Sequence, residues 1–195
     1  MLSRLRGAVK PLILRAGRAL GLLGLKPDYL TYSALALSVA VPALTYAGLI
    51  VHALIAVVVT SILDVLDGAV ARAMGSTSLR GAFLDSFTDR VADASFFIGL
   101  ALAGANTLAS LTALTTSYLI SYSRARGESL GFRLEGVGLM ERGERLLAII
   151  AAYALLAAGA VSAVNAVLAA LTILNTVTII QRVGYVLRGV RKYGV

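Results

Sequence analysis

Apolar residues dominate six long stretches of this chain, and short polar or glycine-containing connections separate them. A helix needs about 20 mainly apolar residues to cross a bilayer, and the length of the chain accommodates six such spans. We therefore expect an all-α integral membrane protein with six transmembrane helices. The expected spans are Tyr29–Ala47, Leu49–Met74, Leu79–Ala103, Leu108–Ser123, Leu146–Ala158 and Val161–Ile180, the last continuing as a helix into a basic tail.

The segment before these spans has a different pattern, in which basic and apolar residues alternate from Leu2 to Gly24. This pattern is typical of an amphipathic helix in the membrane interface, and Pro11 should either kink that helix or begin its main part. Because Arg15 and Arg18 interrupt the apolar stretches, we expect no removable signal peptide. Two parts follow: residues 1–26 as a juxtamembrane helix and residues 27–195 as the six-span domain.

Composition agrees with a membrane protein. Of 195 residues, 58% are hydrophobic and 14% are charged, whereas soluble domains are about half apolar and about a quarter charged. The net charge of +8 is better explained by anionic lipids and substrates than by nucleic acid, which we do not expect as a partner. The absence of cysteine excludes disulfides, thiol nucleophiles and thiolate metal sites.

Charge also predicts the topology. The connections at 47–52, 104–107 and 158–162 contain no Lys, Arg, Asp or Glu, while almost all basic residues lie in or beside the other connections. The largest of those is the polar stretch Arg124–Arg145, whose end should start the fifth helix. The positive-inside rule then places both termini and this stretch on the cytoplasmic side of the cell membrane.

Five aspartates lie within the apolar runs, where each charge costs at least about 2.5 kcal/mol and usually has a function. Asp93 is as well explained as an ordinary partner of Arg90 or of another buried arginine, and the other four form two pairs. Asp64 and Asp67 are three residues apart, and Asp85 and Asp89 are four apart, so each pair occupies one helical face. A tight turn joins the two helices, which should be antiparallel neighbours. Given the helical rise, both pairs lie about 10 to 15 Å from that turn, at matching depth on the cytoplasmic side.

Gathered carboxylates repel one another unless cations or protons neutralise them, and a site of oxygen ligands alone suits Mg²⁺ or Mn²⁺. Two such ions could bind a pyrophosphate and assist an in-line displacement. A structural charge network with Arg72 or Arg90 is the alternative, but such networks are a poor source of stability. A transporter or channel would need acidic groups across the whole membrane depth. An intramembrane prenyltransferase would need more spans.

The motif Asp64-x2-Asp67-Gly68-x2-Ala71-Arg72-x8-Gly81-x3-Asp85-x3-Asp89 resembles the signature of the CDP-alcohol phosphatidyltransferase family at every fixed position. The resemblance implies a homodimer in which an alcohol attacks the lipid-linked phosphorus of a CDP-lipid and releases CMP. It also implies a site of two ions, with Asp64, Asp67 and Asp85 as main ligands and Asp89 as a further ligand and general base. The implied CDP-lipid residues are Pro27, Asp28, Thr31, Asp67, Gly68, Ala71, Arg72 and Gly81.

The acceptor alcohol is predicted from a second group of residues. The stretches around Arg124 and Arg145 resemble elements of phosphatidylinositol-phosphate and archaetidylinositol-phosphate synthases, although Gly127 stands where alanine is usual. Arginines suit a phosphorylated acceptor, although topology alone would also place arginines there. We expect inositol 1-phosphate, with glycerol 3-phosphate as the alternative, and either CDP-diacylglycerol or CDP-archaeol as donor. The implied phosphate ligands are Arg124, Arg126, Arg145 and Arg182.

Overall fold

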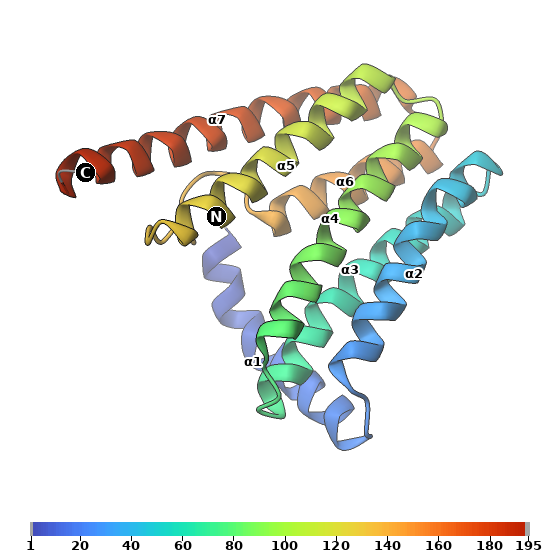
Figure 1. Cartoon of the computed structure of the whole chain (residues 1–195). Coiled ribbons are helices and arrows are strands. Elements are labelled where there is room, and N and C mark those ends of the chain that lie inside the picture. The colour runs from blue at the N-terminus through green and yellow to red at the C-terminus, as the bar shows by residue number, and fades with distance from the viewer. Residues whose placement is uncertain (1, 194–195) are drawn as a thin grey trace. The chain divides into compact units, whose positions relative to one another are not determined.

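The computed structural model describes the backbone of residues 2–193 and the side chains of residues 11–190. Within residues 2–193 every regular element is an α-helix, and Figure 1 shows their order along the chain. The chain forms two compact units, Met1–Gly99 and Leu100–Val195, and the last residues of α4 belong to the second unit. The helices are α1 (Leu2–Leu22), α2 (Pro27–Tyr46), α3 (Ile50–Ala73), α4 (Leu79–Leu102), α5 (Thr107–Ser129), α6 (Arg142–Ala157) and α7 (Val161–Tyr193).

Each of the six runs expected to span a membrane forms a helix at the expected place. Three of these helices are long and apolar enough to cross a bilayer over the segments Pro27–Tyr46, Ile50–Ala73 and Val161–Val190. Of the others, α6 has only 16 residues, and α4 and α5 carry more polar and charged side chains along their length. The described residues are therefore all-helical with three candidate spans, and the count of six spans stays a prediction.

One boundary differs from the sequence expectation. We placed the end of the fourth span at Ser123, but α5 continues as a helix to Ser129. In the added residues, Arg124 and Glu128 form an ion pair of 2.9 Å between Nε and Oε1 at the i, i+4 spacing that stabilises helices. The polar connection is thus shorter, from residue 130 to residue 141, and α6 begins within the charged cluster as expected.

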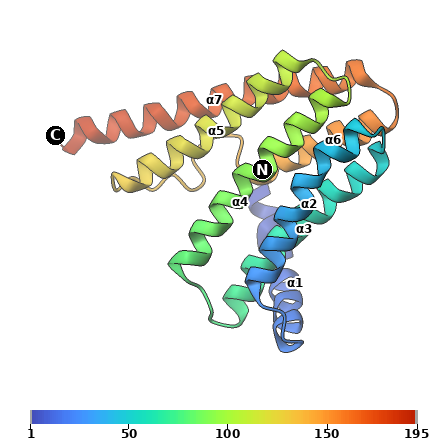
Figure 2. The ribbon, with the colours of Figure 1, turned by 45° about the vertical axis from the view of Figure 1, so that its right-hand side comes forward.

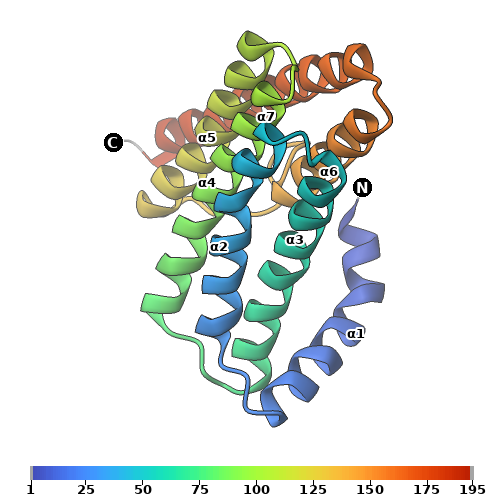
Figure 3. The same cartoon turned by 90° about the vertical axis from the view of Figure 1, so that its right-hand side faces the viewer.

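In the first unit α2, α3 and α4 run side by side, as Figures 1 and 3 show. Pro27 occupies the first turn of α2, where its missing N–H leaves no bond unmade. The turn between α3 and α4 contains Gly75, whose φ of 63° lies in the left-handed region that glycine adopts without strain. This short turn makes the two aspartate-bearing helices neighbours.

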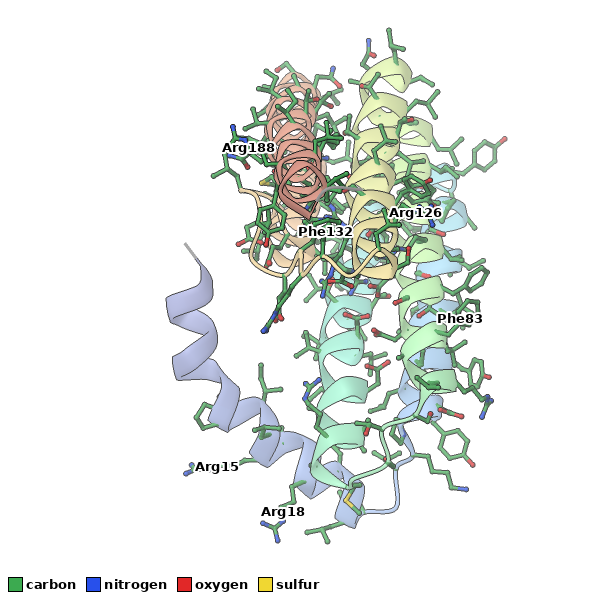
Figure 4. The ribbon with its side chains drawn as sticks, turned by 60° about the vertical axis from the view of Figure 1, so that its left-hand side comes forward. Arg15, Arg18, Phe83, Arg126, Phe132 and Arg188 are labelled. Carbon is green, nitrogen blue, oxygen red and sulfur yellow. The ribbon has the colours of Figure 1, made fainter. Side chains whose placement is uncertain are left out.

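Helix α1 packs closely against α3. A Cβ atom on Gly17 would lie 2.6 Å from the carbonyl carbon of Ala69, and one on Gly21 would meet the side chain of Met74. Arg15 and Arg18 are exposed and point away from α3 (Figure 4). The helix contains Pro11 in its interior, so this proline does not begin it.

In the second unit α5 and α7 run side by side (Figure 2), and α6 also packs on α7. The buried side chain of Asn175 on α7 joins the first pair by donating to the hydroxyl oxygens of Thr116 and Ser117 on α5, both at 3.1 Å. The 130–141 segment lies on α7, where the backbone N–H of Met140 donates to Thr178 Oγ1 at 3.0 Å. This segment is therefore held in a defined position before α6 starts.

Candidate metal centre and substrate pocket

Three of the four predicted aspartates come together at one point in the first unit. Asp64 on α3 and Asp85 and Asp89 on α4 each offer a carboxylate oxygen, and these oxygens lie within 4.8 Å of one another. The four-residue spacing puts Asp85 and Asp89 on one face of α4, and that face meets Asp64. Three carboxylates at this separation favour a divalent cation that accepts oxygen ligands. The donor set therefore fits the metal site that the sequence predicts.

Arg90 lies at the edge of this group. Its Nη1 donates to Asp89 Oδ2 at 3.1 Å and to the backbone carbonyl of Ser86 at 2.6 Å. One contact of the alternative charge network is therefore present. The three carboxylate oxygens nevertheless lie within 4.8 Å of one another, an arrangement that suits a cation.

Asp67, the fourth predicted ligand, has a different local arrangement. Its Oδ2 accepts a hydrogen bond of 2.6 Å from the hydroxyl of Thr31 on α2, and both side chains are buried. Asp67 lies almost one turn beyond Asp64 on α3, which brings it to the α2 side. The sequence analysis placed both Thr31 and Asp67 among the CDP-lipid residues, and the structure joins the two side chains directly.

A pocket of about 750 Å³ lies between the ends of α1, α2, α3 and α4 in the first unit. All eight residues predicted for the CDP-lipid line it, and Asp85 from the carboxylate group lines it as well. Its volume is in the range of ordinary ligand pockets. The residues brought together are Pro27, Asp28, Thr31, Asp67, Gly68, Ala71, Arg72 and Gly81.

Small residues leave the helix backbone accessible from this pocket. A Cβ atom on Gly68 would lie 3.1 Å from Arg72 Nη1, so a larger residue would push the guanidinium aside. At the start of α4 the backbone N–H of Gly81 donates to Ser78 Oγ at 3.0 Å. A ligand can therefore approach the helix backbone closely at both positions.

Two basic residues of the pocket, Lys26 and Arg80, were missed by sequence reasoning. Neither belongs to the motif, and only their places beside the starts of α2 and α4 hinted at a role. Arg80 Nη1 lies 3.1 Å from Asp28 Oδ2, and Nη2 lies 3.4 Å from the hydroxyl of Tyr32. With Arg72 they provide positive charge for a phosphorylated ligand.

The four predicted acceptor residues belong to the second unit and differ in environment. Arg124 and Arg126, near the end of α5, are exposed, whereas Arg145 on α6 and Arg182 on α7 are each only 3% exposed. Arg124 and Arg145 lie close enough to Arg182 for their charges to interact with it, and so do Glu128 and Glu141. The arginines of this mixed cluster suit a phosphate group.

Arg182 also has a structural function that the sequence did not reveal. Its Nε donates to the backbone carbonyl of Val137 at 3.0 Å, and its Nη1 donates to that of Ile120 at 2.7 Å. Arg182 therefore connects α7 to α5 and to the 130–141 segment. A buried guanidinium that satisfies two carbonyls holds the local backbone in place, whatever else its remaining N–H groups bind.

The motif, the carboxylate group and the pocket agree with a phosphotransferase that acts on CDP-linked lipids. The chain belongs to the CDP-alcohol phosphatidyltransferase family, whose model matches residues 25–181. It is accordingly a membrane enzyme of phospholipid synthesis.

Within this family, the chain is similar to two archaeal synthases. The archaetidylinositol phosphate synthase of Pyrococcus horikoshii is 40% identical over 153 residues, covering 78% of this chain and 81% of that protein. The archaetidylinositol phosphate synthase of Aeropyrum pernix is 41% identical over 133 residues, covering 67% of this chain and 68% of that protein.

Solved structures agree with these relatives. The crystal structure of Mycobacterium tuberculosis phosphatidylinositol phosphate synthase with CDP-DAG bound has a TM-score of 0.76 and 30% identity, and covers 90% of this chain and 94% of that chain. The structure of the same enzyme in complex with manganese and citrate also has a TM-score of 0.76, with 31% identity, and covers 89% of this chain and 88% of that chain.

Proposed function

We propose that this protein transfers the phosphatidyl or archaetidyl group of a CDP-lipid to inositol 1-phosphate and releases CMP. The observation that carries the proposal is the pocket lined by all eight predicted CDP-lipid residues, which shares Asp85 with the carboxylate group. The names of the relatives support inositol phosphate as the acceptor.

The carboxylates would hold the metal and handle the proton. Asp64, Asp85 and Asp89, with Asp67 beside them, are proposed to bind two Mg²⁺ or Mn²⁺ ions. Ions bound there supply positive charge to the pyrophosphate and to the phosphoryl group in transfer. Asp89 would act as general base, accepting the proton as the acceptor oxygen bonds to the lipid-linked phosphorus and the bond from that phosphorus to CMP breaks.

The pocket of the first unit would hold the cytidine nucleotide. Gly68, Ala71 and Gly81 leave room for it against the helix backbone, and Pro27, Asp28 and Thr31 contribute from the start of α2. Arg72 would pair with phosphate oxygens. The basic residues Lys26 and Arg80, which the motif does not include, extend this positive lining.

The arginines of the second unit would hold the acceptor phosphate. Arg124 and Arg126 are exposed and accessible, and Arg145 and Arg182 add buried positive charge. Inositol 1-phosphate and glycerol 3-phosphate share this phosphate, so the arginines alone do not select between them. The names of the relatives favour inositol phosphate.

The membrane arrangement is part of the proposal. We infer six spans, with both termini and the site on the cytoplasmic side of the cell membrane, and a homodimer. The exposed apolar side chains of Leu79, Phe83 and Phe87 on α4 support contact with lipid or a second subunit. The exposed Arg15 and Arg18 of α1 support an interfacial position of that helix beside anionic headgroups.

The test is CMP release by purified protein in detergent with Mg²⁺, comparing inositol 1-phosphate, glycerol 3-phosphate, free inositol and serine as acceptors. CDP-archaeol and CDP-diacylglycerol are both supplied as donors. We expect metal-dependent release with inositol 1-phosphate alone. Release with glycerol 3-phosphate alone would retain the catalytic centre and overturn the acceptor. No release with any pair, from protein shown to be folded, would contradict the proposed reaction.

A further inference from the structure

A second, larger cavity lies in the second unit, between the 130–141 segment and the C-terminal half of α7. Its volume is about 1080 Å³, and it shares no lining residue with the pocket of the first unit. We call it the α7 groove. We propose that the α7 groove binds an anionic phospholipid of the surrounding bilayer, as a site separate from the one where the CDP-lipid reacts.

The charge of the lining selects an anion. Arg133 comes from the 130–141 segment and Arg188 from α7, and the twelve lining residues include no Asp or Glu. Arg133 Nη2 contacts Glu135 at 3.0 Å, and a guanidinium has further N–H donors. The pocket of the first unit, in contrast, contains three aspartates beside its three basic residues. Arg188 and the remaining N–H donors of Arg133, which also pairs with Glu135, match the phosphate of a headgroup.

The rest of the lining suits a lipid chain. Ile180 and Val190 of α7 and Phe132 of the opposite segment are apolar, and Gln181 and Tyr185 add polar groups. The ring of Phe132 packs directly on the backbone of Gly189, where a side chain would collide with it. Figure 4 labels Phe132 and Arg188, which come from the two walls of the groove. An aromatic ring and two guanidinium groups in the same lining suit an amphiphile better than a free anion.

The location also favours a bilayer lipid. The membrane-length apolar part of α7 covers Val161–Val190, and the α7 groove occupies its last three turns. Headgroups lie at the ends of membrane-spanning helices, where arginines and tyrosines contact them. Exposed Val183 and Leu187 in the same turns present an apolar surface to acyl or isoprenoid chains. A lipid could therefore enter from the bilayer with its headgroup between Arg133 and Arg188.

Gly184 allows a sharp steric test. It lines the groove within a helix, and a Cβ atom there would meet nothing within 4 Å. Gly184→Leu therefore fills empty space while raising helix propensity. Ala170→Leu, at an exposed position outside the groove on the same helix, is the control for added bulk. The double variant Arg133→Gln with Arg188→Gln removes the charge, and the matched pair of Lys substitutions retains it.

The experiment is native mass spectrometry of delipidated full-length protein in detergent, titrated with phosphatidylglycerol, phosphatidylcholine or inorganic phosphate. We expect a phosphatidylglycerol site that phosphatidylcholine does not fill. Affinity at that site should fall about tenfold or more in the Gln pair and in Gly184→Leu, while Ala170→Leu and the Lys pair largely retain it.

Three results would overturn the proposal. Equal binding of phosphatidylcholine would mean that the groove does not select charge. Saturation by inorganic phosphate alone would indicate an ion site rather than a lipid site. Unchanged phosphatidylglycerol binding in both the Gln pair and Gly184→Leu would place the lipid elsewhere. Because no turnover is measured, these outcomes are independent of the proposed reaction.

Discussion

The carboxylate group of the first unit and the arginines of the second unit are both concentrations of charge within apolar helices, but they are organised differently. Asp64, Asp85 and Asp89 direct oxygens of the same sign toward one point, within 4.8 Å. Arg182 instead uses its N–H groups on two backbone carbonyls of its own unit. Negative charge in the first unit is arranged for a ligand, whereas part of the positive charge in the second unit holds the protein together.

This difference predicts opposite consequences of mutation. Removing a carboxylate from a group of like charges relieves repulsion, so chemistry should be lost while the fold is kept. Removing a buried arginine that links three segments through their carbonyls breaks that link, so the fold should suffer first. The variants below test this contrast.

Asp89→Asn should have the largest effect on turnover. The amide cannot take the proton of the acceptor hydroxyl, and loss of a general base lowers rates by about 10² to 10⁴-fold. CMP release under saturating substrates measures the loss, and thermal unfolding in the same detergent should match the unsubstituted protein. Retained turnover would remove Asp89 from the role of base, and a large loss of stability would contradict the contrast between the two units.

Arg182→Gln should chiefly destabilise the protein. The carbonyls of Ile120 and Val137 lose a charged donor, and hydrogen bonds to charged groups contribute about 1.5 to 3 kcal/mol each. Thermal unfolding and limited proteolysis of the 130–141 segment would detect the change, with Arg126→Gln as the exposed control. A stable Arg182→Gln variant with an intact 130–141 segment and only a raised acceptor KM would assign Arg182 to the substrate alone.

Thr31→Val should weaken the affinity of the site for metal without removing any carboxylate. Loss of the 2.6 Å bond from Thr31 frees the orientation of Asp67, and losing a hydrogen bond to a metal ligand typically lowers metal affinity about tenfold or more. The concentration of Mg²⁺ that gives half-maximal CMP release should rise accordingly. Thr31→Ser keeps the hydroxyl and should restore the original value, whereas equal behaviour of both variants would argue against this positioning role.

Arg126→Gln should have the smallest of these effects. Its side chain is exposed, and exposed ion pairs contribute about 1 kcal/mol or less. The acceptor KM should rise about fivefold or less, with the CDP-lipid KM unchanged. An effect on the CDP-lipid KM instead would connect Arg126 with the donor.

The spacing of the aspartates along the chain was enough to predict that two neighbouring helices of the first unit carry the carboxylate group. The intervals between Asp64, Asp67, Asp85 and Asp89 define faces of two helices, and the tight turn at Gly75 forces those helices to be neighbours. For this reason the motif residues of α3 and α4 line one pocket, whereas Pro27, Asp28 and Thr31 of α2 were predicted only by the resemblance to the family. The apolar runs likewise predicted six of the helices, because helix length and position depend mainly on local sequence.

The partners across helices were decided only by the tertiary structure. Nothing in the sequence near Thr31 indicates that its hydroxyl meets Asp67, 36 residues later. Similarly, nothing near Arg182 identifies the carbonyls of Ile120 and Val137 as its acceptors. Such contacts depend on the rotation and depth at which helices pack, and many side chains determine both together. Local periodicity therefore specified the helices and the motif, and packing specified which polar atoms they share.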